Sequence, residues 1–132
     1  MRAALLAAGL ALCALPAAAQ EVDCANAMTQ ADMNQCAQAE WEAADHALNS
    51  AYKAAMALLR QWDDELPTEL KGGADNLRLA QRSWITFRDA ACAVEGYPMR
   101  GGSAEPLLVL GCMTRLTEAR TADLQALVEF GD

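Results

Sequence analysis

The sequence has very little histidine and no pattern typical of a catalytic centre. His46 is the only histidine in 132 residues, and Ser50, the hydroxyl one helical turn away, has no sign of activation. Paired carboxylates such as Glu40 and Glu42 lack the apolar surroundings that would raise one pKa. We therefore expect no enzymatic activity and no catalytic residue.

Strand patterns, phosphate loops and metal-binding clusters are also missing. No segment alternates apolar and polar residues with the period of a strand, and no internal repeat is present. A glycine-rich phosphate loop would have to follow a strand. The last four cysteines are spaced by 12, 56 and 20 residues, without the close pairs of structural zinc sites. Scattered methionines fit gap-filling in a core better than a copper site. We expect no metal and no cofactor.

The first 19 residues predict a secretory signal peptide. A short positive start is followed by an almost continuous apolar run over residues 3–15, and an Ala-x-Ala pattern ends at Ala19. This run is too short for a stable membrane anchor. Cys13 is a poor lipid-attachment site because Leu12 precedes it where a small residue is expected. We expect cleavage after Ala19 and one periplasmic or secreted domain over residues 20–132.

Basic residues are scarce in the exported part. Without Arg2, nine Lys and Arg residues stand against eighteen Asp and Glu residues, so the net charge is about −9. This charge disfavours nucleic acid and anionic membrane surfaces as partners. It favours a basic protein partner, although acidity also serves the solubility of exported proteins alone.

Capping patterns mark the starts of helices. Thr29 and Asp32 form a capping box in its Asp form, and apolar residues then recur at three- and four-residue steps to about residue 62, without glycine or proline. This predicts one long helix. Asp75 or Asn76 is expected to cap the next helix.

Two segments rich in turn residues, 63–73 and 96–103, interrupt the helical pattern. They leave a second helix over about residues 76–94 and a third over about residues 106–130, with Pro106 suited to its start. Three helices with two connections of roughly ten residues predict an all-α, antiparallel three-helix bundle.

Four cysteines remain in the exported part: Cys24, Cys36, Cys92 and Cys112. An even number in an exported domain predicts two disulfides, and the bundle topology places all four at one end. We favour the pairs Cys24–Cys36 and Cys92–Cys112 because each is local. A loop of about twenty residues closed in this way stabilises the fold by on the order of 3 kcal/mol. Crossed pairings between the first helix and the other two stay open.

The segment 80–92 is expected to be the central helix of the bundle. One face carries two aromatic residues between alanines: Ala80, Trp84, Phe87 and Ala91. We expect Trp84 and Phe87 to fill the core. Gln81 and Arg88 lie on the flank of this face, where we expect them to make polar contacts between helices.

The rise per residue predicts one buried ion pair. If Cys36 and Cys112 lie at the same height along the bundle axis, the heights of Asp45 and Arg120 differ by only about one residue. We therefore predict an Asp45–Arg120 pair beside Trp84, since a partly buried carboxylate there needs the guanidinium. Asn49 and Tyr52 continue the Asp45 face on the next two turns.

Two surfaces are candidates for binding a partner. The first is the segment 96–103, where Tyr97, Arg100 and Ser103 lie among turn residues between two cysteines; a loop held at both ends loses less entropy on binding. The second is the acidic segment 63–69 at the opposite end of the bundle. An ordinary helix connection and a solvated linker are the plainer interpretations.

The order and spacing of many residues resemble the LprI-type lysozyme inhibitor domain over about residues 23–127. The residues that carry the resemblance are Asp23, Cys24, Ala25, Asn26, Ala27, Met28, Thr29, Met33, Asn34, Gln35, Cys36, Ala37, Ala44, Asp45, Leu48, Asn49, Tyr52, Leu77, Arg78, Ala80, Gln81, Arg82, Trp84, Phe87, Arg88, Asp89, Cys92, Gly101, Gly102, Ser103, Cys112, Leu116, Thr117, Arg120 and Leu124. The acidic segment 63–69 has no counterpart in the pattern. The resemblance implies a small helical, disulfide-bonded, exported protein that binds and inhibits lysozyme, and we expect it to occlude the cleft of its partner. The alternative is a structural or accessory module of the envelope that does not touch lysozyme.

Overall fold

A computed structural model describes residues 22–131, so the predicted signal peptide, Cys13 and the cleavage after Ala19 lie outside the described residues. The elements in chain order are η1 (Cys24–Asn26), α1 (Gln30–Glu65), η2 (Thr68–Leu70), α2 (Gly73–Gly96), η3 (Tyr97–Met99) and α3 (Glu105–Gly131).

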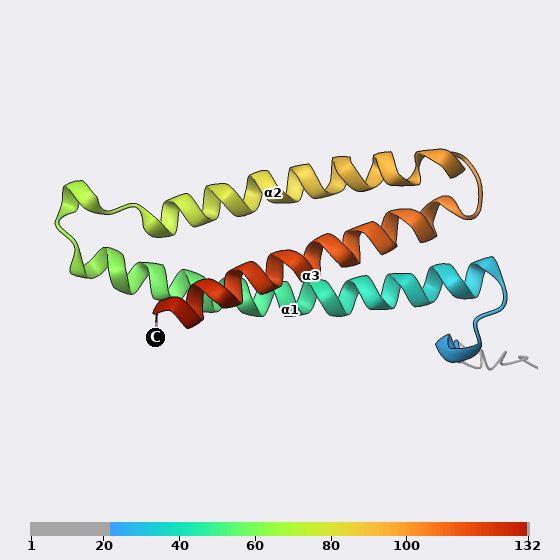
Figure 1. Cartoon of the computed structure of the whole chain (residues 1–132), viewed down its shortest axis with the longest axis horizontal. Coiled ribbons are helices and arrows are strands. Elements are labelled where there is room, and N and C mark those ends of the chain that lie inside the picture. The colour runs from blue at the N-terminus through green and yellow to red at the C-terminus, as the bar shows by residue number, and fades with distance from the viewer. Residues whose placement is uncertain (1–21, 132) are drawn as a thin grey trace, which may run out of the picture.

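The three long helices run up, down and up, and α3 contacts both α1 and α2 (Figure 1). Residues 22–131 contain no strand. The prediction of an all-α, antiparallel three-helix bundle is confirmed.

The apolar core lies in the half of the bundle that contains η2. Its buried members are Leu48, Ala51, Ala55, Met56, Ala74, Leu77 and Leu124. Partly buried Tyr52 and Trp84 pack against this cluster from α1 and α2. Several core positions are alanine, which lets the helix backbones approach closely but buries little apolar area per residue. The other half of the bundle needs a different source of stability.

That source is a pair of disulfides, both at the opposite end. Cys24 is bonded to Cys36 and Cys92 to Cys112, with Cα–Cα distances of 5.6 and 5.4 Å. Cys92 and Cys112 are 0% and 2% exposed, so the second bond is itself part of the interior. The favoured local pairing is confirmed, and the crossed pairings are wrong.

The first helix begins as predicted, but the connection after it is different. The Thr29 side chain accepts a hydrogen bond from the backbone N–H of Asp32 at 3.1 Å. α1 then continues to Glu65, so the first residues of the acidic segment are helical. The prediction that Asp75 or Asn76 caps α2 is wrong, because the N-cap position is Gly72 and no side chain at that position forms a cap.

Asp63 caps α2 from the last turn of α1. Its carboxylate accepts hydrogen bonds from the backbone N–H groups of Gly72, Gly73 and Ala74 at 2.9, 2.9 and 3.0 Å. Gly72 has a φ of +137°, in the region that favours glycine, and this turn directs the N–H groups at the carboxylate. A negative charge at this position also complements the N-terminal end of the helix dipole.

Replacing Asp63 by asparagine is therefore expected to lower the melting temperature at neutral pH. The N–H groups of Ala74, Gly72 and Gly73 hold the pKa of Asp63 below its ordinary value. A group with a lowered pKa in the folded state stabilises the fold above its unfolded pKa, and this contribution is lost as the pH falls below about 4. Thermal unfolding should thus show a lower melting temperature for the variant than for the native protein at pH 7, and this difference should narrow toward pH 3. Asp64→Asn, one residue away, is the control; equal melting temperatures for the two variants would contradict the cap.

The inward face of α2 differs from the prediction. Gln81, Arg88 and Cys92 are 8%, 6% and 0% exposed, whereas Phe87 is 61% exposed. Trp84 contacts the core as expected, but the placement of Phe87 in the core is wrong. The buried Cys92–Cys112 bond lies on the polar flank, which faces inward, while Phe87 faces out.

Candidate functional site

A buried guanidinium is the centre of the polar contacts between α1 and α2. Arg88 Nε and Nη2 donate to Asp89 Oδ1 at 2.9 and 2.8 Å, and Nη1 lies 3.7 Å from Asp45 Oδ1. The Arg88 Cζ atom lies 5.9 Å from the centroid of Trp41 and 5.1 Å from that of Trp84. Two carboxylates and two ring faces thus compensate the charge of a side chain that is only 7% exposed.

The predicted Asp45–Arg120 pair is wrong, because each residue has a different partner. Asp45 pairs with Arg88 and accepts a hydrogen bond from Asn49 Nδ2 at 2.9 Å. Arg120 Nε donates to Gln81 Oε1 at 3.1 Å. The inference that Gln81 and Arg88 make polar contacts between helices is borne out by these bonds.

The predicted alignment of α1 and α3 along the bundle axis agrees with the structure, but the predicted rotation of α1 about its own axis does not. Ala44 and Ala47 on α1 line the same groove as Thr121 on α3. Asp45 is about 100° further around α1 than Ala44, so its side chain reaches α2 and not α3. Arg120 is likewise turned from α1 toward α2.

A double-mutant cycle distinguishes these partners. Asp45→Ala combined with Arg88→Met should show a coupling of about 0.5–1 kcal/mol, since the ion pair is half exposed on the Asp45 side. Asp45→Ala combined with Arg120→Ala should be additive within about 0.5 kcal/mol. The free energies come from urea unfolding at low salt. Strong coupling in the second cycle and none in the first would contradict the observed contacts.

Five of the six predicted polar residues line a groove between α1 and α2; the sixth, Arg120, is not among its lining residues but binds Gln81, which is. The volume of this groove is about 410 Å³, and it is lined by Asp45, Leu48, Asn49, Tyr52, Arg78, Gln81, Arg82, Ile85 and Arg88. Sequence reasoning missed Arg78 and Arg82 as members. The available signal was their spacing: Arg78 is three residues before Gln81, Arg82 is three before Ile85, and the two arginines are four residues apart.

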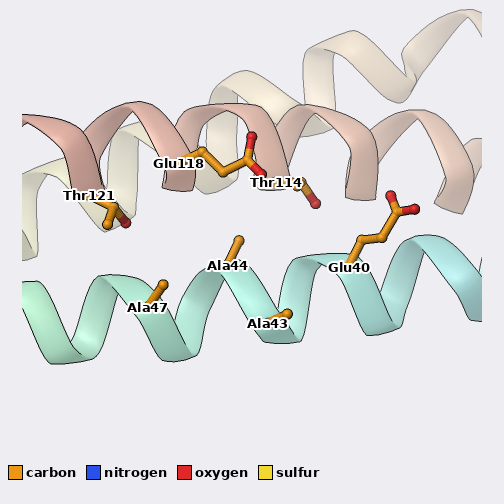
Figure 2. Close-up of a pocket in the computed structure, with 7 residues that line it drawn as sticks. All are labelled: Glu40, Ala43, Ala44, Ala47, Thr114, Glu118 and Thr121. Atoms are coloured by element: carbon orange, nitrogen blue, oxygen red, sulfur yellow. The ribbon is translucent and has the colours of Figure 1, made fainter.

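A second groove lies between α1 and α3 and is negatively charged. Its volume is about 480 Å³, and it is lined by Glu40, Ala43, Ala44, Ala47, Thr114, Glu118 and Thr121. Figure 2 shows alanine side chains of α1 facing α3, with Glu40 and Glu118 on opposite helices. The Thr114 hydroxyl is buried and has no hydrogen-bond partner among residues 22–131. No sequence pattern predicts this groove, since it depends on the rotation of two helices.

The loop at the cysteine end is braced by three polar contacts. Arg100 Nη1 donates to Glu105 Oε1 at 2.8 Å, and the Gly101 N–H donates to Glu105 Oε2 at 2.7 Å. Asn34 Nδ2 on α1 donates to the carbonyl oxygen of Ser103 at 2.9 Å. The Gly101 N–H and the Arg100 guanidinium hold the pKa of Glu105 below its ordinary value. These contacts fix the loop against both α1 and α3.

The predicted partner-binding residues therefore differ in availability. Tyr97 is 67% exposed, whereas the Arg100 side chain, although 65% exposed, is paired with Glu105. Ser103 is exposed, and only its backbone carbonyl is bound, by Asn34. Met99, which the sequence reasoning missed, is 49% exposed beside Tyr97. The loop presents two large apolar side chains on a braced backbone.

The acidic segment at the other end is partly structural. Asp63 is bonded to the start of α2, while Leu66 and Leu70 are 40% and 64% exposed.

Among residues 22–131, no helix combines the length and the hydropathy needed to cross a bilayer. In the same part of the chain, no group of three or more His, Cys, Asp or Glu side chains is placed to hold a metal ion.

Comparisons with known proteins show which family the chain belongs to. A protein of Rhizobium meliloti (strain 1021), described as uncharacterized, is 44% identical over 138 residues, and the match covers 100% of this chain and 99% of that protein. No solved structure matches the chain significantly. The model of the family described as "Lysozyme inhibitor LprI" matches residues 23–124. The chain therefore belongs to the LprI lysozyme inhibitor family.

Proposed function

We propose that the protein is an exported, non-enzymatic inhibitor that binds a lysozyme-like glycosidase and blocks its cleft with the loop at the cysteine end. Family membership supports lysozyme as the class of partner. The two disulfides fit an oxidising compartment, which supports a periplasmic or secreted location, with residues 1–19 as the signal peptide.

The observation that carries the proposal is the exposed Tyr97 on a braced loop. Aromatic side chains dominate the energetics of many protein interfaces. The Cys92–Cys112 bond and the Arg100–Glu105 pair hold the loop in one conformation, so little entropy is lost when it binds. Tyr97 and Met99 would enter the cleft, and the end of the bundle would exclude substrate.

The charge of the protein supports a basic partner. The exported part carries about −9, from nine basic and eighteen acidic residues. Opposite net charges accelerate the encounter and make association depend on salt. Inhibition should therefore weaken as ionic strength rises.

The direct test is the lysis of cell-wall suspensions by several types of lysozyme, with purified residues 20–132 added. We expect at least one type to be inhibited, with a matching binding signal in calorimetry. If no type is bound or inhibited, the proposal fails and an accessory module of the envelope is the better interpretation.

Tyr97→Ala is expected to weaken inhibition at least tenfold, which corresponds to about 1.4 kcal/mol of binding free energy. The melting temperature should not change, because the side chain is exposed. Leu70→Ala is the matched control: Leu70 is similarly exposed, at 64%, but lies at the opposite end of the bundle. Equal potency of the two variants would move the binding surface away from the loop.

A further inference from the structure

The outer side of α2 carries an apolar surface that the bundle does not use. Leu79, Phe87 and Val94 are 64%, 61% and 71% exposed. They are separated by eight and seven residues, so they share one face of the helix, and the small residues Ser83 and Ala90 lie between them. We call these five residues the outer α2 face.

The outer α2 face is free of charge. Arg88 is turned inward, and Arg82 and Asp89 lie together on one rim of the face. A surface helix normally presents charged side chains opposite its buried stripe, and exposed apolar patches of this kind mark interaction sites. In Figure 1, α1 and α3 lie on the same side of α2, so its other side has no neighbour among the described residues.

The pattern of large and small residues on this face is self-complementary. If a second copy of α2 lies antiparallel, with a two-fold axis between Thr86 and Phe87, Leu79 is level with Val94 of the second copy. Ser83 is then level with Ala90 of the second copy. The two Phe87 rings meet beside the axis, where these small residues leave room for them. Large residues thus face large ones and small residues face small ones.

The charges on the rim fit the same arrangement. Antiparallel packing brings Arg82 of one copy within about 3 Å of the level of Asp89 of the other, on the same side of the interface. Arg88 uses only Oδ1 of Asp89, so the second carboxylate oxygen is available. Arg82 makes no ion pair within residues 22–131. Parallel packing would place Arg82 against Arg82, which is repulsive.

We propose that the outer α2 face is the interface of an antiparallel homodimer with a two-fold axis beside Phe87. Such an interface is isologous and closes with two copies. The two cysteine-end loops would point in opposite directions, so one dimer would present two equivalent loops. This inference does not depend on the identity of the protein that the loop binds.

Sedimentation equilibrium of residues 20–132 over a concentration series tests the dimer. We expect the native protein to have the mass of a dimer, which dissociates into monomers on dilution. The Phe87→Glu variant should have the mass of a monomer at every concentration up to at least 100-fold above the dissociation constant of the native dimer. Phe130→Glu is the matched control, because Phe130 is 86% exposed on α3 and should leave the dimer intact. Circular dichroism checks that both variants remain folded.

Cysteine cross-linking tests the orientation. Ser83→Cys combined with Ala90→Cys should form interchain disulfides under mild oxidation. Ser83→Cys alone should not, because the two Ser83 positions lie about 10 Å apart along the axis, beyond disulfide reach. A native monomer at all concentrations, a dimer that survives Phe87→Glu, or cross-linking of Ser83→Cys alone would overturn the proposal. It would equally be overturned if Phe87→Glu left the mass unchanged and abolished lysozyme binding, since the face would then belong to the partner.

Discussion

Replacing Arg88 by alanine should lower the free energy of unfolding by about 3 kcal/mol, a large effect for a single substitution. The side chain is 7% exposed and fills the space between Trp41 and Trp84. Truncation leaves a cavity between the two rings and removes both cation–π contacts. It also leaves Asp45 and Asp89 without their shared cation, which adds to the loss.

Urea unfolding followed by far-ultraviolet circular dichroism would measure this loss, and thermal unfolding should show a fall of roughly 10–20 °C. Arg82→Ala is the control on the same helix, where an exposed side chain should change the stability by no more than about 0.5 kcal/mol. Arg88→Lys should lie between the two, because lysine keeps the charge but cannot stack as a plane between rings. Similar stabilities for Arg88→Ala and Arg82→Ala would show that the guanidinium is not a structural element.

Removing the Cys92–Cys112 disulfide, by replacing both cysteines with alanine, is expected to cost about 3 kcal/mol. The bond closes a loop of 20 residues and joins the end of α2 to the early turns of α3. Both sulfur atoms are buried, so the change also loses packing at an end of the bundle that has little other apolar contact. The loop that carries Tyr97 should become mobile, and inhibition should weaken together with stability.

The Cys24–Cys36 disulfide provides the comparison. It connects η1 to the start of α1, and Cys24 itself is exposed. Its removal should release residues 22–28 but leave the three-helix bundle folded. Calorimetry of the two double variants would therefore show a large fall in melting temperature for the Cys92–Cys112 variant and a small one for the other. Equal falls would mean that η1 contributes to the bundle as much as the buried bond does.

The sequence was sufficient for features that depend on local pattern. The start of α1 and its extent to within a turn of Glu65 follow from the Thr29 cap and the helical period. Locality favoured the observed disulfide pairs but left crossed pairings open. The rotation of α2 about its own axis was not predictable in the same way. This helix has apolar residues on two faces, so periodicity gives the period but does not decide whether Phe87 or Gln81 faces inward.

The predictions of the Asp45 partner and of the α2 cap were wrong for a related reason. The Asp45–Arg120 prediction used level alone, and a rotation of about 100° separates the residue that meets α3, Ala44, from the one that meets α2, Asp45. The Asp63 cap was missed because local candidates, Asp75 and Asn76, satisfy the same rule. A cap donated by the preceding helix requires knowledge of how the chain turns at Gly72.

The separation of the apolar core from the disulfides has a consequence for where the protein can be active. A chain with reduced cysteines would keep the packed half near η2, while the other half would open first, and amide exchange should be fastest there. The Tyr97 loop belongs to that half. The loop would therefore become ordered only after oxidation, so the proposed inhibition would begin only when the chain reaches an oxidising compartment.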